Sequence, residues 1–243
     1  MHIRKRQRLL PGQMLLAGVL GMGLRLLLNG YCTDYRLLLP TFHPLGVALG
    51  LLTAAALGLA LYASIKMGKA PEAPEAAPAS FQAFWGHLLA ALGIGLTLLG
   101  SASEMHGSLG LVWKGLACAS IPCLIAAGWL RLQGKQPVFL LHLCPCLYLV
   151  AHTIGQYQRW SSDPQLLNYI FPLLGIISMV FFAFYHSTFD AGFSWKRRLN
   201  FCGLAAICLG IMALPGCSYP WLYLGMVLWA LTDLPEPSEV EDK

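Results

Sequence analysis

Charged residues are scarce in this sequence. Only 11% of its 243 residues are Asp, Glu, Lys or Arg, whereas 57% are hydrophobic. A soluble globular protein usually carries about 25% charged residues, which cover its surface. Two stretches, 45–65 and 165–189, contain none of the four charged residue types. The composition therefore excludes an ordinary soluble domain and predicts a polytopic membrane protein.

Catalytic signatures are also missing. The sequence contains no HExxH or GxSxG motif and no cluster of carboxylates suited to a magnesium–phosphate site. No Asp or Glu lies in the middle of an apolar block, although proton-coupled transporters usually depend on such a carboxylate. No loop is long enough to fold as a soluble domain. These absences disfavour a hydrolase and a transporter that couples its own energy source.

Eight apolar blocks follow one another along the chain. A helix needs about 20 apolar residues to cross the hydrocarbon core, and lipid offers no partner to backbone groups outside a helix. We therefore expect an all-α, polytopic transmembrane helix bundle of about eight spans. In the alternative, the last two short blocks form a re-entrant hairpin beside six spans. The blocks are 9–28, 44–65, 84–101, 109–130, 137–156, 164–189, 199–214 and 220–234.

Basic residues divide unequally between the two sides of this predicted bundle. Of the 16 Lys and Arg residues, only Arg36 and Arg159 fall in the outer loops, and Arg25 and Lys114 lie within helices. Because cytoplasmic loops are enriched in basic residues, we expect both termini in the cytoplasm, with the plasma membrane as the location. The net charge of +5 then reflects a cytoplasmic rim facing anionic lipid and requires no nucleic-acid partner.

The chain divides into four predicted parts. Residues 1–66 form a two-helix hairpin, 67–82 an extended Pro/Ala/Glu linker, 83–234 a six-helix bundle and 235–243 an acidic cytoplasmic tail. Small residues recur every four positions from Gly46 to Gly58, a pattern that lets helix backbones approach closely. We expect this face to pack within the chain. A membrane-protein partner or a second copy of the chain is the alternative, and lipid surrounds the rest.

Polar residues near the outer helix ends suggest a ligand site. Arg25 and Lys114 are cations inside apolar blocks, and His43 and His152 lie towards the same side. Polar groups at such depth are costly unless they pair, reach the interface or face a cavity. One hypothesis is a cationic pocket for a small anion, with these four residues as ligands. In the favoured alternative, the cations extend to lipid headgroups and the histidines cap helices.

The other three histidines inside the predicted bundle lie towards the cytoplasmic ends of their helices. These are His87, His142 and His186. Asp190 follows His186 by one helical turn, which makes these two residues the best remaining acid–base pair. We expect this pair to close its helix and to meet the arginines at 197–198.

The segment His142 to Cys146 contains the most specific local motif. Cys144-Pro145-Cys146 resembles the ion-binding segment of heavy-metal-pumping P-type ATPases, in which soft thiolates hold Cu or Zn. The resemblance covers three residues, and the chain lacks the large phosphorylation and nucleotide domains of those pumps. It implies a soft-metal site with His142, Cys144 and Cys146 as ligands. The alternative is that the cysteines serve as small apolar side chains beside a proline kink.

The remaining patterns leave the function open. Cys32 and Cys217 fall in outer loops, where an oxidising compartment would allow a disulfide, although reduced cysteines are the alternative. The leading hypothesis is a subunit that binds or translocates a small solute, with an anion as the favoured class, and lacks an energy-coupling domain. The alternatives are a non-catalytic structural or assembly subunit of a membrane complex, and an intramembrane enzyme or soft-metal-binding protein.

Overall fold

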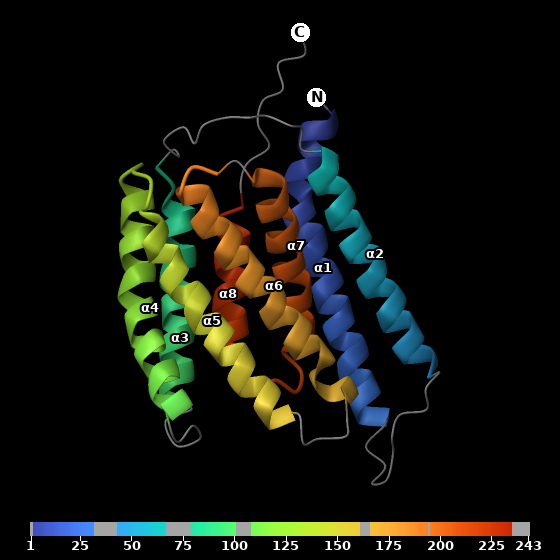
Figure 1. Cartoon of the computed structure of the whole chain (residues 1–243). Coiled ribbons are helices and arrows are strands. Elements are labelled where there is room, and N and C mark those ends of the chain that lie inside the picture. The colour runs from blue at the N-terminus through green and yellow to red at the C-terminus, as the bar shows by residue number, and fades with distance from the viewer. Residues whose placement is uncertain are drawn as a thin grey trace.

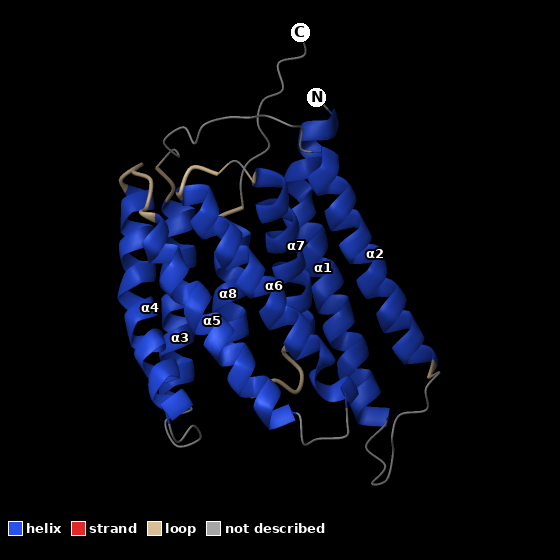
Figure 2. Ribbon diagram, in the orientation of Figure 1, coloured by secondary structure: helices blue, strands red, loops and turns tan. Residues whose placement is uncertain are grey.

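A computed structural model describes residues 2–31, 43–66, 79–100, 108–160, 166–193 and 195–234. The described residues form eight α-helices and contain no strand (Figures 1 and 2). This confirms the predicted all-helical fold. The helices are α1 (His2–Tyr31), α2 (Pro44–Lys66), α3 (Phe81–Gly100), α4 (Ser108–Leu132), α5 (Phe139–Trp160), α6 (Leu166–Asp190), α7 (Lys196–Ala213) and α8 (Pro220–Thr232).

Length and hydropathy divide these helices into two groups. In the described part of the chain, α1 to α6 are long and apolar enough to cross a membrane, so the chain has the architecture of a multi-pass integral membrane protein. Helix α8 is apolar but has only 13 residues, and α7 has 18 residues that begin with three basic side chains. Both short helices are largely buried among the others. The exact number of spans and the side of each terminus stay predictions.

Successive helices run in opposite directions. The odd-numbered helices therefore begin, and the even-numbered helices end, at one end of the bundle, which we call the N/C end (Figure 1). Helix α7 packs against α1, α2, α6 and α8, while α3 packs against α4 and α8. Helix α2 lies at one edge of the bundle and α4 at the other (Figure 1). This order brings α3, α5, α6 and α8 to the functional site described below.

Close backbone approach fixes α8 against α3. A Cβ atom placed on Gly225 of α8 would lie 2.7 Å from the carbonyl oxygen of Leu89 on α3, and the Cα atom of Gly93 would be 3.3 Å away. Real Cβ atoms do not approach a backbone oxygen so closely, so the contact requires glycine. Gly86, one helical turn from Leu89, similarly faces Thr232 near the end of α8. The contact thus continues to the N/C end, where α8 stops.

The glycines on the small-residue face of α2 were expected to pack against another part of the chain, but they do not. Cβ atoms placed on Gly46, Gly50 or Gly58 would meet nothing within 4 Å. In α1, by contrast, Gly18 and Gly21 lie against side chains of α7. Most of the predicted linker 67–82 and the tail 235–243 lie outside the described residues, and the four-part division stays a prediction.

Candidate functional site

Three histidines and two aspartates meet inside the N/C end of the bundle. His87 comes from α3, His142 from α5, His186 and Asp190 from the last turns of α6, and Asp233 from the residue after α8. The three imidazoles are 0–1% exposed, the Asp190 side chain is 0% exposed and that of Asp233 is 10% exposed. The sequence predicted that these histidines share one end of the bundle, and the structure brings them into contact.

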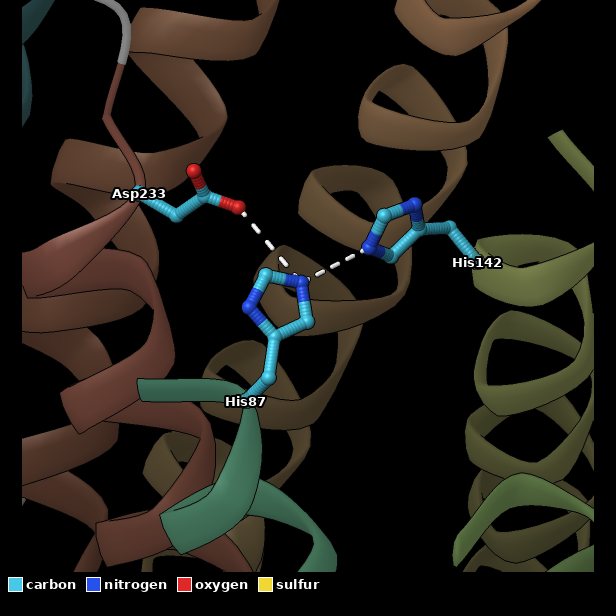
Figure 3. A group of neighbouring side chains, drawn as sticks. All are labelled: His87, His142 and Asp233. Atoms are coloured by element: carbon cyan, nitrogen blue, oxygen red, sulfur yellow. Dashed lines mark hydrogen bonds and ion pairs between the residues drawn. The ribbon is translucent and has the colours of Figure 1, made fainter. Parts of the chain in front are cut away.

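The histidines of α3 and α5 point their Nε2 atoms at each other (Figure 3). His87 Nδ1 lies 2.7 Å from the carbonyl oxygen of Ala83, which only accepts, so this nitrogen carries the proton. His142 Nδ1 donates to the Asp190 carboxylate, so it is protonated for the same reason. Both Nε2 atoms therefore present lone pairs, and they are 2.8 Å apart. Two facing lone pairs require a proton or a metal ion between them.

The Asp233 carboxylate completes the group on the α8 side. Its Oδ2 atom lies 3.6 Å from His87 Nε2. The same oxygen accepts a hydrogen bond from His186 Nε2 at 2.7 Å and one from Trp229 Nε1 at 3.4 Å. Asp233 therefore accepts hydrogen bonds from two side chains of the cluster.

A buried arginine from α4 faces the other carboxylate. Arg131 Nη2 lies 3.4 Å from Asp190 Oδ1, and the Arg131 residue is 6% exposed. Asp190 thus meets Arg131 rather than the arginines at 197–198, because those two side chains line the cavity between α2, α6 and α7 instead. Two carboxylates and one guanidinium leave one net negative charge before the histidines are counted. A buried charge is costly unless it is balanced, so the cluster requires at least one further proton or a cation.

Aromatic side chains surround the histidines. The Trp229 indole stacks on His142 with ring centroids 5.5 Å apart and an angle of 14° between the planes. Phe182 packs edge-on against both Trp229 and His186. Such walls exclude water and lower the local polarity, which strengthens electrostatic interactions within the cluster.

The donor atoms lie close enough together to hold one metal ion. An ion with bonds of about 2.05 Å keeps its ligand atoms about 3.3 Å apart. The two Nε2 atoms are 2.8 Å apart, the His87–Asp233 separation is 3.6 Å, and all three ligand atoms lie within 4.8 Å of one another. A second group of three, formed by His142, His186 and Asp190, meets the same criterion. In the described part of the chain, Arg131 Nε is buried without a hydrogen-bond partner, and His186 Nδ1 has only the Asp190 carboxylate at 3.6 Å. Buried polar groups of this kind are usually satisfied by a bound water or ion.

Each residue of the first group, His87, His142 and Asp233, also has an outer partner, meaning a group that hydrogen-bonds to the ligand and orients it towards the metal. Metal-binding histidines usually donate their second ring nitrogen to a carboxylate or a backbone carbonyl, and ligating carboxylates accept a further hydrogen bond. Here His87 donates to Ala83, His142 to Asp190 and His186 to Asp233. His87, His142 and Asp233 are therefore oriented for an ion of the class that imidazole and carboxylate prefer, such as Zn²⁺.

The cysteines of the Cys-Pro-Cys motif are placed differently. Cys146 is buried, and its thiol donates to the carbonyl oxygen of Val180 at 3.7 Å. Cys144 is partly buried and neighbours Cys123. Neither thiol belongs to the groups of metal-donor atoms found among the described residues, whereas His142 belongs to both. The soft-metal site of His142, Cys144 and Cys146 stays a prediction.

The four residues of the predicted anion pocket occupy several environments. His152 is fully buried, and its Nδ1 accepts a hydrogen bond from Trp113 at 3.0 Å. His43 precedes α2 and accepts from the Leu45 amide, while Lys114 lies on α4 and is partly buried. Arg25 lies near Gly216 of the α7–α8 loop, and the His152 ring packs against Tyr219 of the same loop. The shared anion pocket stays a prediction. Cys32, the proposed partner of Cys217, lies outside the described residues.

Arg25 turns into the bundle instead of extending to lipid headgroups. It is 3% exposed, and its Nη1 atom donates to the Met212 carbonyl at 2.6 Å. The guanidinium also lies over the Phe171 ring, 5.1 Å from the centroid. Arg25 thus joins α1 to α6 and α7, and the alternative in which it snorkels is wrong.

We expect Arg25→Met to lower the free energy of unfolding by about 1.5–3 kcal/mol, because a hydrogen bond from a charged donor is lost and the buried Met212 carbonyl is left without it. Thermal unfolding in detergent measures the change, with Lys135→Met in the exposed α4–α5 loop as the matched control. Equal midpoints for the two variants would contradict the structural role of Arg25. Metal content should not change in either variant.

Two members of the cluster were missed by sequence reasoning. Asp233 ends the last apolar block, and Arg131 ends the fourth; each is a charged residue at a helix terminus, where such residues are common. They belong to the cluster because Asp233 contacts His87 and His186 and because Arg131 contacts Asp190. These contacts depend on which helices pack side by side. The one signal in the sequence was that both fall on the same predicted side as the three histidines.

Comparison with known proteins adds no relative. No protein-family model, curated protein or solved structure matches this chain. The buried cluster is therefore the feature from which a function can be inferred.

Proposed function

We propose that this chain is a multi-pass membrane protein that binds a divalent transition metal ion of the zinc class. The ligands are His87 Nε2, His142 Nε2 and a carboxylate oxygen of Asp233. The observation that carries the proposal is the 2.8 Å approach of two imidazole nitrogens whose opposite ring nitrogens are both engaged as donors. A divalent ion at this position coordinates both lone pairs and places positive charge beside the Asp233 carboxylate.

The donor set supports an ion of intermediate softness. Two imidazole nitrogens and one carboxylate oxygen suit Zn²⁺, Fe²⁺, Mn²⁺ or Ni²⁺, whereas Cu⁺ prefers thiolates and Ca²⁺ prefers oxygen ligands. Three protein ligands leave one tetrahedral position for a further group. Under this proposal the small solute expected from the sequence is a metal cation, rather than the anion that the outer-end residues suggested.

The bound ion also connects parts of the bundle that are distant in sequence. His87, His142 and Asp233 come from α3, α5 and the end of α8, and the outer partners of His142 and Asp233, which are Asp190 and His186, come from α6. A metal that binds the folded chain and not the unfolded chain stabilises it by mass action. We therefore expect zinc to raise the thermal midpoint of the wild-type protein.

Metal analysis of the purified protein tests the proposal. The chain is purified in mild detergent, stripped with a chelator, reloaded with Zn²⁺ and desalted, and bound metal is measured by plasma mass spectrometry. We expect one tightly bound ion per chain in the wild type and in the control His43→Gln, which changes a histidine outside the cluster. Wild-type protein that retains no zinc would show that the histidines share only protons and form a structural hydrogen-bond network.

Metal affinity should fall as the pH falls. Under this proposal the metal-free protein holds one proton between His87 Nε2 and His142 Nε2, and a metal ion must displace it. Because one proton is released for each ion bound, the apparent zinc affinity should decrease about tenfold for each unit by which the pH falls. Competition with a zinc chelator of known pH dependence, at about pH 6 and about pH 7.5, measures this slope. An affinity that does not change with pH would contradict the shared proton.

A further inference from the structure

A cavity outside the histidine cluster lies between helices at the same N/C end of the bundle. It has a volume of about 400 Å³ and lies between the last turns of α2, the last turns of α6 and the first turns of α7. Most of its lining side chains are apolar, among them Leu61, Phe181 and Phe201. Helix α2 packs against α1 and α7, and a hydrogen bond from Asn200 to Ser64 holds its end against α7. The space between α2 and α6 is therefore a groove lined by α2, α6 and α7.

Basic residues stand where this groove reaches the N/C end. Arg197 and Arg198 line the cavity, and Lys196 precedes them in the first turn of α7, which contains no acidic residue. Three cations at the positive end of a helix dipole repel both the dipole and one another. Arg198 packs over the Trp195 ring at 4.3 Å, an arrangement that fixes its stem beside the groove. The positive charge of this end complements a negatively charged group.

We propose that this groove binds an anionic phospholipid. One acyl chain occupies the apolar cavity between α2, α6 and α7, and the headgroup phosphate lies against Arg197 and Arg198. The two features fit one ligand because the basic end lies where the helices meet the membrane surface and the apolar part runs inward along the span. Basic pockets between transmembrane helices recognise anionic headgroups in this manner. The inference is independent of the metal site.

Native mass spectrometry of delipidated protein with added phosphatidylglycerol tests this inference. The variant is the double substitution Arg197→Gln and Arg198→Gln, and the control is Lys135→Gln, a basic residue at the same end that does not line the groove. We expect phosphatidylglycerol affinity to fall about fivefold for each arginine removed, or roughly 25-fold for both. The control should retain wild-type affinity. Equal affinity in all three proteins would overturn the proposal.

A lipid comparison on the wild-type protein keeps the inference testable even where the double variant does not fold. Phosphatidylglycerol should raise the thermal midpoint, whereas phosphatidylcholine and the water-soluble headgroup glycerol phosphate should not. Stabilisation by phosphatidylcholine to the same extent would show that the arginines do not select the lipid. Stabilisation by glycerol phosphate to the same extent would show that the groove holds no acyl chain. Either result would overturn the proposal.

Discussion

The variant His142→Gln is expected to abolish tight zinc binding. His142 supplies one of three ligands, and its Nδ1 atom is the one bonded to Asp190, so glutamine removes both the metal–imidazole bond and its orienting contact. We expect affinity to fall by more than about a thousandfold, which exceeds the 10–100-fold typical of losing an outer partner alone. Zinc titration by competition with a fluorescent chelator measures it.

A graded series separates the ligand from its partner. Asp190→Asn keeps an acceptor near His142 but removes its charge, so zinc affinity should fall about 10–100-fold. His152→Gln changes an equally buried histidine of the same helix that bonds to Trp113 instead, and it should bind zinc as the wild type does. If His142→Gln and His152→Gln lose zinc equally, the loss reflects damage to α5 and the metal assignment is wrong.

The variant Gly225→Ala is expected to destabilise the bundle. Its Cβ atom would lie 2.7 Å from the Leu89 carbonyl oxygen and 3.1 Å from the Ala90 Cα atom, and both are backbone atoms that cannot move aside. Overpacking of this kind costs about 1–3 kcal/mol, which lowers the thermal midpoint by about 2–10 °C for a chain of this size. Separation of α8 from α3 should also weaken zinc binding, because Asp233 moves away from His87.

Gly95→Ala on α3 is the matched control. Its Cβ atom would meet only the end of the Ile121 side chain, at 3.8 Å. Alanine also favours helix over glycine by about 1 kcal/mol, so this variant should be as stable as the wild type or more stable. If Gly225→Ala is as stable as Gly95→Ala, the close approach of α3 and α8 does not hold the site together.

The helices could be predicted because lipid imposes a simple rule on the sequence. The blocks 44–65 and 220–234 correspond closely to α2 (Pro44–Lys66) and α8 (Pro220–Thr232), since proline marks each start and polar residues mark each end. The shared end of His87, His142 and His186 also followed, because each histidine is near a helix terminus and successive helices alternate in direction. Both predictions need only the position of each residue along the chain, and not knowledge of which helices are neighbours.

The contacts within the cluster could not be predicted, because they depend on which helices are neighbours. The close packing of α3 and α8 places Asp233 beside His87. It depends on Gly93 and Gly225, and their spacing in the sequence looks like that of any other small residues. The direction of Arg25 was similarly undetermined, since its depth allows both a path to the headgroups and a turn towards Met212. The accessible carbonyl of Met212 decides between them, and it is visible only in the folded chain.

X-ray absorption spectroscopy of the zinc-loaded wild-type protein tests the central claim most directly, since it reports the ligand types around the ion. The account predicts nitrogen and oxygen ligands at about 2.0–2.1 Å, with the scattering pattern of two imidazoles and no sulfur. Sulfur ligands at about 2.3 Å would instead assign the ion to Cys144 and Cys146. That result, or the absence of stoichiometric zinc, would contradict a metal site formed by His87, His142 and Asp233.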